Sequence, residues 1–99
     1  MKTIDDIAVA VSAILVRYDV REAYLFGSFA RGDQTSESDV DLRLACGDSM
    51  TFGTLYELSQ ELEKALGRPV EIVTNPPEYM RKAFRDNIQR DEVLLYEAA

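Results

Sequence analysis

The sequence predicts an α/β fold of the α+β kind, a small mixed β-sheet of three to four strands flanked by helices. Three observations support this prediction. Stretches with helical periodicity alternate along the chain with short aliphatic and aromatic stretches that have a period of two. Residues 39–74 have a strand–helix–strand pattern, which predicts two parallel strands joined by a right-handed crossover. The preceding strand joins this unit through a connection too short for a crossover, so that pair is predicted to be antiparallel.

The first helix and the first strand are predicted from the N-terminal quarter of the chain. Apolar residues recur at helical spacing over 4–18, and Thr3 with Asp6 forms a variant capping box, so we expect a helix there. Residues 22–26 are aliphatic and aromatic and stop at Gly27, which indicates a short strand. One helical turn and a polar loop follow, at 27–31 and 32–38.

The central unit consists of a strand, a long helix and a second strand. Residues 39–45 alternate, and the two predicted faces are Val40, Leu42 and Leu44 on one side and Asp39, Asp41 and Arg43 on the other. A helix is expected over 51–66, because its leucines form an apolar stripe and Gly67 lies where a left-handed stop belongs. A further strand is predicted at 70–74.

A final helix and a short last strand complete the predicted elements. Asn75 is expected to cap a helix that opens with Pro76-Pro77 and runs to about Gln89, and a strand is expected at 93–96. Four basic residues lie on this helix: Arg81, Lys82, Arg85 and Arg90. We interpret them as a solvated helix face, with a binding patch as the alternative.

Length and composition indicate one domain over residues 1–99. Hydrophobic residues make up 46% of the chain and charged residues 29%, as in ordinary soluble proteins, and no apolar stretch is long enough to span a bilayer. Acidic residues within the apolar N-terminal run argue against a signal peptide, so we expect a cytoplasmic protein. The net charge of −7 disfavours nucleic acid as a partner. The sequence contains no histidine, which excludes His-ligated zinc and leaves carboxylates as the candidate general bases.

The most informative segment is GSFARGDQTSESDVDL, which begins at Gly27. Gly27 and Ser28 follow one predicted strand, and Asp39 and Asp41 begin the next. Carboxylates two residues apart on a strand point to the same side of the sheet, so they can share divalent metal. A glycine lets the backbone approach a triphosphate closely, and a serine hydroxyl with the following amides can hold its phosphates. This combination predicts nucleotidyl transfer.

Nucleotidyl transfer uses two Mg²⁺ ions about 3.5–4 Å apart, which hold the attacking and leaving oxygens. We expect Asp39 and Asp41 to bind both ions. One of the metal ions also needs a further carboxylate ligand near the attacking hydroxyl, and Glu71 is the candidate because the crossover places its strand beside residues 39–45. The alternative for Glu71 is an exposed strand residue without a catalytic role.

Two arginines near this segment have roles that the sequence leaves open. Arg31 lies one helical turn beyond the glycine–serine turn and is expected to neutralise phosphate charge, although it could instead pair with Asp33 or Glu37. Arg43 shares the predicted face of the two aspartates, where it would compete with metal. It could instead lie beyond the site and contact a phosphate or a partner protein.

Together these residues resemble the signature of the minimal nucleotidyltransferases of the DNA polymerase beta superfamily. That signature is a Gly-Ser pair, ten residues and Asp-x-Asp, commonly elaborated as GSxARG…SDxDL. The matching residues are Gly27, Ser28, Ala30, Arg31, Gly32, Ser38, Asp39, Asp41 and Leu42. The resemblance implies the polymerase beta-like nucleotidyltransferase fold, with metal bound by Asp39 and Asp41. It also implies that Gly27 and Ser28 bind the triphosphate, and it adds Ser38 to the nucleotide-binding residues.

Two positions depart from the family pattern. The third acid, most often aspartate in the family, is here Glu71, and Arg43 stands where an apolar residue is common.

Small stand-alone members of this family are similar to antitoxins that are encoded beside HEPN-domain ribonuclease toxins. The resemblance implies Mg²⁺-dependent transfer of AMP from ATP to a tyrosine of a partner toxin. A chain of 99 residues leaves no second domain to hold an acceptor, so the acceptor is expected on a partner protein. Two alternatives are a non-catalytic antitoxin with a decayed site and an enzyme that modifies a small molecule.

Overall fold

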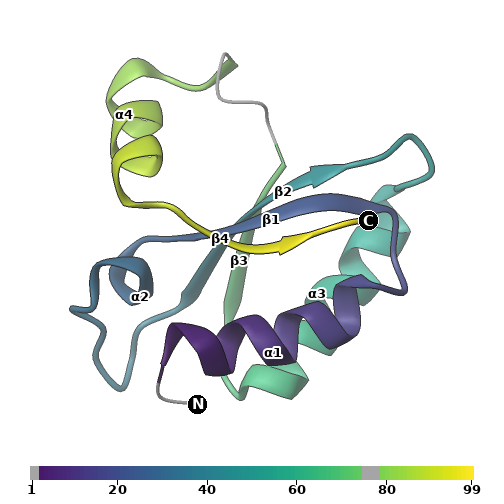
Figure 1. Ribbon diagram of the computed structural model, residues 1–99, viewed down its shortest axis with the longest axis horizontal. Coiled ribbons are helices and arrows are strands. Elements are labelled where there is room, and N and C mark those ends of the chain that lie inside the picture. The colour runs from purple at the N-terminus through teal and green to yellow at the C-terminus, as the bar shows by residue number, and fades with distance from the viewer. Residues whose placement is uncertain (1–2, 75–78) are drawn as a thin grey trace.

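The computed structural model describes residues 3–74 and 79–99, which form one four-stranded β-sheet with helices on both sides (Figure 1). The elements in chain order are α1 (Ile4–Leu15), β1 (Val20–Phe26), α2 (Ser28–Arg31), β2 (Val40–Cys46), α3 (Phe52–Leu66), β3 (Val70–Val73), α4 (Lys82–Asp91) and β4 (Val93–Glu97). None of the helices in this part of the chain is long and apolar enough to cross a membrane.

The topology of the sheet confirms the predicted fold class. The strand order is β3-β2-β1-β4. β1 is antiparallel to β2 and to β4, whereas β2 and β3 are parallel and are connected through α3. The short connection therefore gives the antiparallel pair, and the long helical connection gives the parallel one, as predicted.

One face of the sheet carries the hydrophobic core. Figure 1 shows α1 and α3 on this side and α4 on the other. The alternating side chains of β2 that were predicted to face inward, Val40, Leu42 and Leu44, are all buried. They pack with buried residues of α1 and α3, among them Val11, Leu58 and Leu62. The opposite face of β2 therefore presents Asp41 and Arg43 on the side of α4.

The helix ends follow local hydrogen-bonding groups. Thr3 and Asp6 form the predicted capping box at the start of α1. Thr51 caps α3 by accepting from the amide of Thr54 at 3.1 Å. Gly67 ends α3 at a φ of +68°, as expected for a left-handed helix stop.

Two helix boundaries differ most from the prediction, and β1 also begins earlier than predicted, at Val20 rather than at residue 22. α1 ends at Leu15 rather than at residue 18, because Tyr18 donates its amide to the carbonyl of Leu15 in a tighter turn that leads into β1. α4 begins at Lys82 rather than near residue 76, because Arg81 is still extended. The predicted cap Asn75 and the pair Pro76-Pro77 lie outside the described residues.

Candidate active site

A hollow of about 350 Å³ lies where the end of β1 meets α2, β2 and α4. Its lining residues are Phe26, Gly27, Ser28, Arg31, Asp41, Phe84, Asn87, Ile88 and Asp91. The structure thus brings the predicted phosphate-binding turn, Arg31 and Asp41, one of the three predicted metal ligands, together around one space.

Gly27 forms the tightest part of this arrangement. Its backbone has a φ of +76° and a ψ of −155°, a conformation that is available almost only to glycine. A Cβ atom at this position would overlap the Oδ2 atom of Asp41 and lie 3.1 Å from its Cγ. The missing side chain therefore lets the turn and the carboxylate lie against each other.

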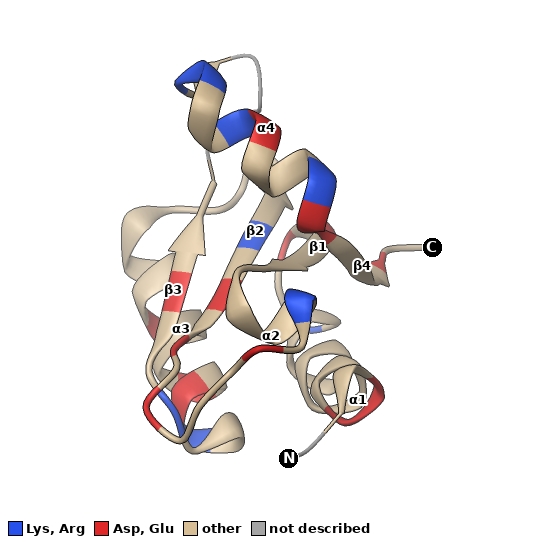
Figure 2. Ribbon diagram, turned by 90° about the vertical axis from the view of Figure 1, so that its left-hand side faces the viewer, with Lys and Arg blue, Asp and Glu red and all other residues tan. Residues whose placement is uncertain are grey.

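The acidic residues gather at one end of β2 and β3. Asp41 is the register partner of Glu71, and Figure 2 shows the acidic segments of these two strands side by side. Asp39 is exposed and lies immediately before β2. The pKa of Asp41 is raised to about 6, first by burial and then by the charge of Glu71, a hydrogen bond with Glu71 and the charge of Asp39. The three predicted acids therefore interact electrostatically.

The donor set suits a divalent metal ion. Carboxylate oxygens are the ligands that Mg²⁺ prefers, and the charges of Glu71 and Asp39 add to burial in raising the pKa of Asp41. In the described part of the chain, however, no three acidic side chains are already arranged at metal-binding distances. Asp39, Asp41 and Glu71 have the right chemistry to hold Mg²⁺, and their side chains would need to adjust to do so.

Arg31 has the ion pair with Asp33 that was one of its predicted alternatives, and it also borders the hollow. It lines the hollow, and its Nε atom lies 3.1 Å from Oδ2 of Asp33. Its Nη1 atom also lies 3.5 Å from Oδ2 of Asp91 on α4, a partner that sequence analysis did not anticipate. The side chain is 46% exposed, so its charge remains accessible to a phosphate.

Arg43 does not occupy the space between the acids. Its register partner is Val73, one alternation beyond the Asp41–Glu71 pair. Its guanidinium binds the carboxylate of Glu92 through two contacts of 3.0 Å. Its charge is thus neutralised outside the hollow.

Ser38 serves the loop before β2. Its hydroxyl accepts from the amide of Thr35 at 2.8 Å, and its carbonyl accepts from Nη1 of Arg68 at 3.1 Å. Ser38 is not among the described residues that line the hollow, so the structure assigns it to loop conformation and does not bring it to the other predicted nucleotide-binding residues.

Sequence analysis missed the α4 wall of the hollow. This wall consists of Phe84, Asn87, Ile88 and Asp91. Their spacing is that of one helical face, so the signal was present in the sequence. It could not be used, because periodicity does not say against which face of a sheet a helix packs.

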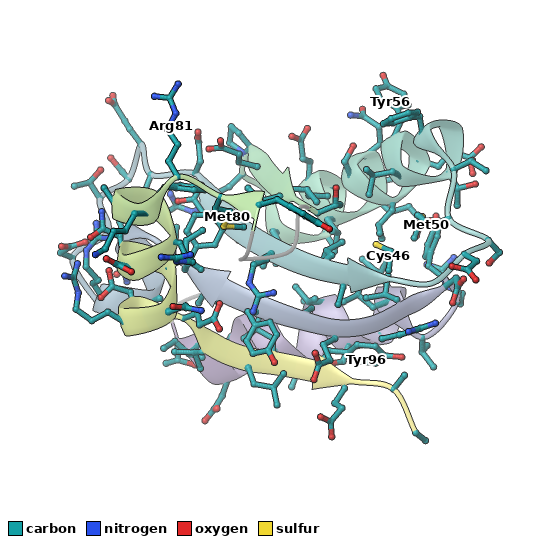
Figure 3. All side chains as sticks on the ribbon, turned by 90° about the horizontal axis from the view of Figure 1, so that it is seen from above. Cys46, Met50, Tyr56, Met80, Arg81 and Tyr96 are labelled. Atoms are coloured by element: carbon teal, nitrogen blue, oxygen red, sulfur yellow. The ribbon has the colours of Figure 1, made fainter. Side chains whose placement is uncertain are left out.

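A second hollow, of about 310 Å³, lies at the far end of β2. Its lining includes Cys46, Met50, Phe52 and Leu55. Figure 3 shows Cys46 and Met50 at the end of the sheet opposite α4. Burial raises the pKa of the Cys46 thiol, so this thiol is poorly suited to act as a nucleophile.

The fold and the site together define a nucleotidyltransferase. Residues 10–99 match the family model described as "Polymerase beta, Nucleotidyltransferase", and the chain belongs to this family.

One related protein and two solved structures show which members of the family this chain is similar to. A Methanocaldococcus jannaschii protein named as a protein adenylyltransferase, MJ1379, is 37% identical over 79 residues, which cover 73% of this chain and 77% of that protein. A crystal structure of a toxin–antitoxin complex with AMP-PNP contains a chain that is 22% identical, with a TM-score of 0.73 over 92% of this chain and 73% of that one. A tri-AMPylated Shewanella oneidensis HEPN toxin in complex with its MNT antitoxin contains a chain that is 18% identical, with a TM-score of 0.69 over 97% and 74% of the two chains. The two structures show the shared fold.

Proposed function

We propose that this protein is a metal-dependent adenylyltransferase that transfers AMP from ATP to a tyrosine hydroxyl of a partner HEPN toxin and thereby acts as an antitoxin. The observation that carries the proposal is the contact between the Gly27 turn and the Asp41 carboxylate inside one hollow. In this proposal the turn binds phosphate and the carboxylate holds metal, and their contact supports the proposal because nucleotidyl transfer requires both groups side by side. The names of the related adenylyltransferase and of the MNT–HEPN complex support a HEPN toxin as the protein that accepts AMP.

Each residue of the hollow has a defined role in this proposal. The hydroxyl of Ser28 and the amides that follow Gly27 bind the terminal phosphates, since the first amides of a helix have no partner within it. Arg31 neutralises phosphate charge by exchanging its contact with Asp91 for one with the nucleotide. The side chains that line α4 enclose the rest of the nucleotide.

The acidic residues would hold Mg²⁺. When bound, Mg²⁺ stabilises the negative charge that develops on the phosphate oxygens during transfer. Asp41 has to be ionised to bind the metal, and with a pKa of about 6 it is ionised at neutral pH. In the reaction, the acceptor oxygen forms a bond to the α-phosphorus, and the bond from the α-phosphorus to the oxygen that bridges to the β-phosphorus breaks. Pyrophosphate leaves with that oxygen, and the hydroxyl proton passes to one of the three carboxylates.

The direct test combines the purified protein, MgATP and the partner toxin. We expect the toxin to gain the mass of one or more AMP groups, measured on the intact protein. The double variant Asp39→Asn with Asp41→Asn should abolish this gain while the protein stays folded, because the change removes metal affinity and not core packing. Transfer that persists in the double variant would contradict the roles given to these residues.

The alternative is an antitoxin that binds its toxin without catalysis. It is motivated by the finding that no three acids of the described residues are already arranged to hold a metal. Titration calorimetry separates the two functions. A catalytic site binds MgATP and loses this binding when Mg²⁺ is chelated, whereas a decayed site shows no metal-dependent binding of the nucleotide.

A further inference from the structure

We propose that Arg43 is a positioning residue, which holds the C-terminal end of α4 on the sheet through Glu92 and thereby sets the α4 wall of the hollow. We call this contact the Arg43–Glu92 clasp. The inference rests on the proposed function, because the hollow is the site that would bind ATP.

The clasp has the geometry of a specific contact. Nε of Arg43 lies 3.0 Å from Oε2 of Glu92, and Nη2 lies 3.0 Å from Oε1. The two side chains are only 11% and 16% exposed. The guanidinium also lies over the ring of Tyr24, 4.3 Å from its centroid. Two parallel hydrogen bonds and a stacked face fix the orientation of the pair, which a single exposed ion pair does not do.

α4 depends on such contacts for its position. It has ten residues, which is too short for a stable isolated helix, and Ile88 is its only buried residue. The ring contact of Phe84 and the ion pair of Asp91 also hold the helix, but both groups line the hollow and would be rearranged by a ligand. Arg43 and Glu92 lie outside the described lining, so the clasp can persist when a ligand binds.

The clasp affects the hollow because Glu92 is the neighbour in sequence of Asp91, which lines the hollow. Glu92 closes α4 by donating its amide to the carbonyl of Ile88 at 2.8 Å. It directly follows Asp91, which faces Arg31 across the hollow. The next residue, Val93, pairs with Leu25 of β1, so the clasp is a second attachment at this end of α4 and sets how closely the helix lies to the phosphate-binding turn and to Asp41.

The test uses Arg43→Gln and the charge exchange Arg43→Glu with Glu92→Arg. Hydrogen exchange of the α4 amides is measured in the ligand-free protein, and the affinity for Mg²⁺ with AMP-PNP is measured by titration calorimetry. We expect Arg43→Gln to speed amide exchange in α4 and to weaken nucleotide affinity at least fivefold. The KM for ATP should rise while kcat stays close to that of the wild type, and the charge exchange should restore both affinity and amide protection in part.

The matched control is Arg17→Gln, which breaks the exposed ion pair between Arg17, in the turn after α1, and Glu61 of α3. This variant should change neither α4 exchange nor nucleotide affinity. If Arg43→Gln does not fold, Arg43→Lys keeps the charge but loses the parallel bonds, and it should show the same changes to a smaller degree.

Unchanged α4 exchange in Arg43→Gln, or a charge exchange that restores nothing, would overturn the clasp. A wild-type protein that binds no nucleotide would instead contradict the proposed function and the effect on affinity. The exchange data would still decide whether Arg43 positions α4.

Discussion

The backbone of Gly27 and the carboxylate of Asp41 are in contact, so a side chain added at position 27 would displace the carboxylate. Gly27→Ala should displace the carboxylate and strain a conformation with positive φ, lowering the free energy of unfolding by about 1–3 kcal/mol and abolishing AMP transfer. Urea denaturation and the transfer assay measure the two effects. Gly53→Ala is the control, since the nearest atom to its Cβ would be 3.9 Å away; it should leave both quantities unchanged or raise stability slightly.

Asp41 is held in the folded protein at a cost to stability. Its pKa is raised to about 6 from an ordinary value of 3.8, so between these pH values the folded chain binds more protons than the unfolded chain. Stability therefore falls as the pH rises through this window, and the full loss is present above it. The shift corresponds to about 1–2 kcal/mol after a discount for the partial exposure of the side chain.

Asp41→Asn removes this cost. Without Mg²⁺, we expect the variant to be more stable than the wild type by about 1–2 kcal/mol at pH 8 and by almost nothing at pH 4. Denaturant titrations at the two pH values check this. Equal stability at pH 8, or an advantage that grows as the pH falls, would contradict the raised pKa.

At the scale of single residues, the sequence was informative wherever a role depends on near neighbours in the chain. Gly27, Ser28 and Arg31 lie on one short segment with a regular spacing to Asp41, and the structure brings them together. Glu71 could be placed from the crossover rule alone. The ion pairs of Arg31 with Asp91 and of Arg43 with Glu92 could not be predicted. Ion pairs between distant segments produce no periodic pattern in a sequence.

At the scale of elements, α4 and the N-terminal end of α3 offer a matched comparison. Each presents a phenylalanine beside a hollow: Phe84 is 43% exposed and Phe52 is 92% exposed. Of these two residues, Phe84 borders the hollow of the phosphate-binding turn and Phe52 does not. The ring of Phe84 contacts that of Phe26 at a centroid distance of 6.1 Å and an angle of 87°.

Phe84→Ala should therefore weaken MgATP binding roughly tenfold, a loss of about 1.4 kcal/mol. Phe52→Ala should leave this affinity unchanged. Titration calorimetry on both variants makes the comparison. Equal affinities for the two variants would mean that the α4 wall does not contact the nucleotide.

The elements themselves were predicted more reliably than their ends. Helical stripes located α1 and α3, and alternation located β2, because those patterns report directly on which side chains are buried. The ends of α1 and α4 shifted because single hydrogen bonds and backbone angles set them. A capping residue marks such an end in the sequence only where its side chain does the capping, as Thr51 does for α3.

At the scale of the whole molecule, the topology followed from connection lengths, whereas the position of α4 on the open face did not. The same chain carries a net charge of −7, and the acids around Asp41 concentrate part of that charge at one end of the sheet. Any salt should therefore stabilise the fold by screening, and Mg²⁺ should add a specific effect through binding.

The two effects can be separated in thermal unfolding experiments. At a Mg²⁺ concentration of about ten times its Kd, binding should contribute about 1.4 kcal/mol. For a domain of this size, that contribution raises the Tm by roughly 5–10 °C beyond the shift that NaCl produces at equal ionic strength. The double variant Asp39→Asn with Asp41→Asn should start from a higher Tm without Mg²⁺ and respond equally to the two salts. If Mg²⁺ and NaCl raise the Tm of the wild type equally, the acids do not form a metal site. The negative charge near Asp41 would then only lower the stability of the fold.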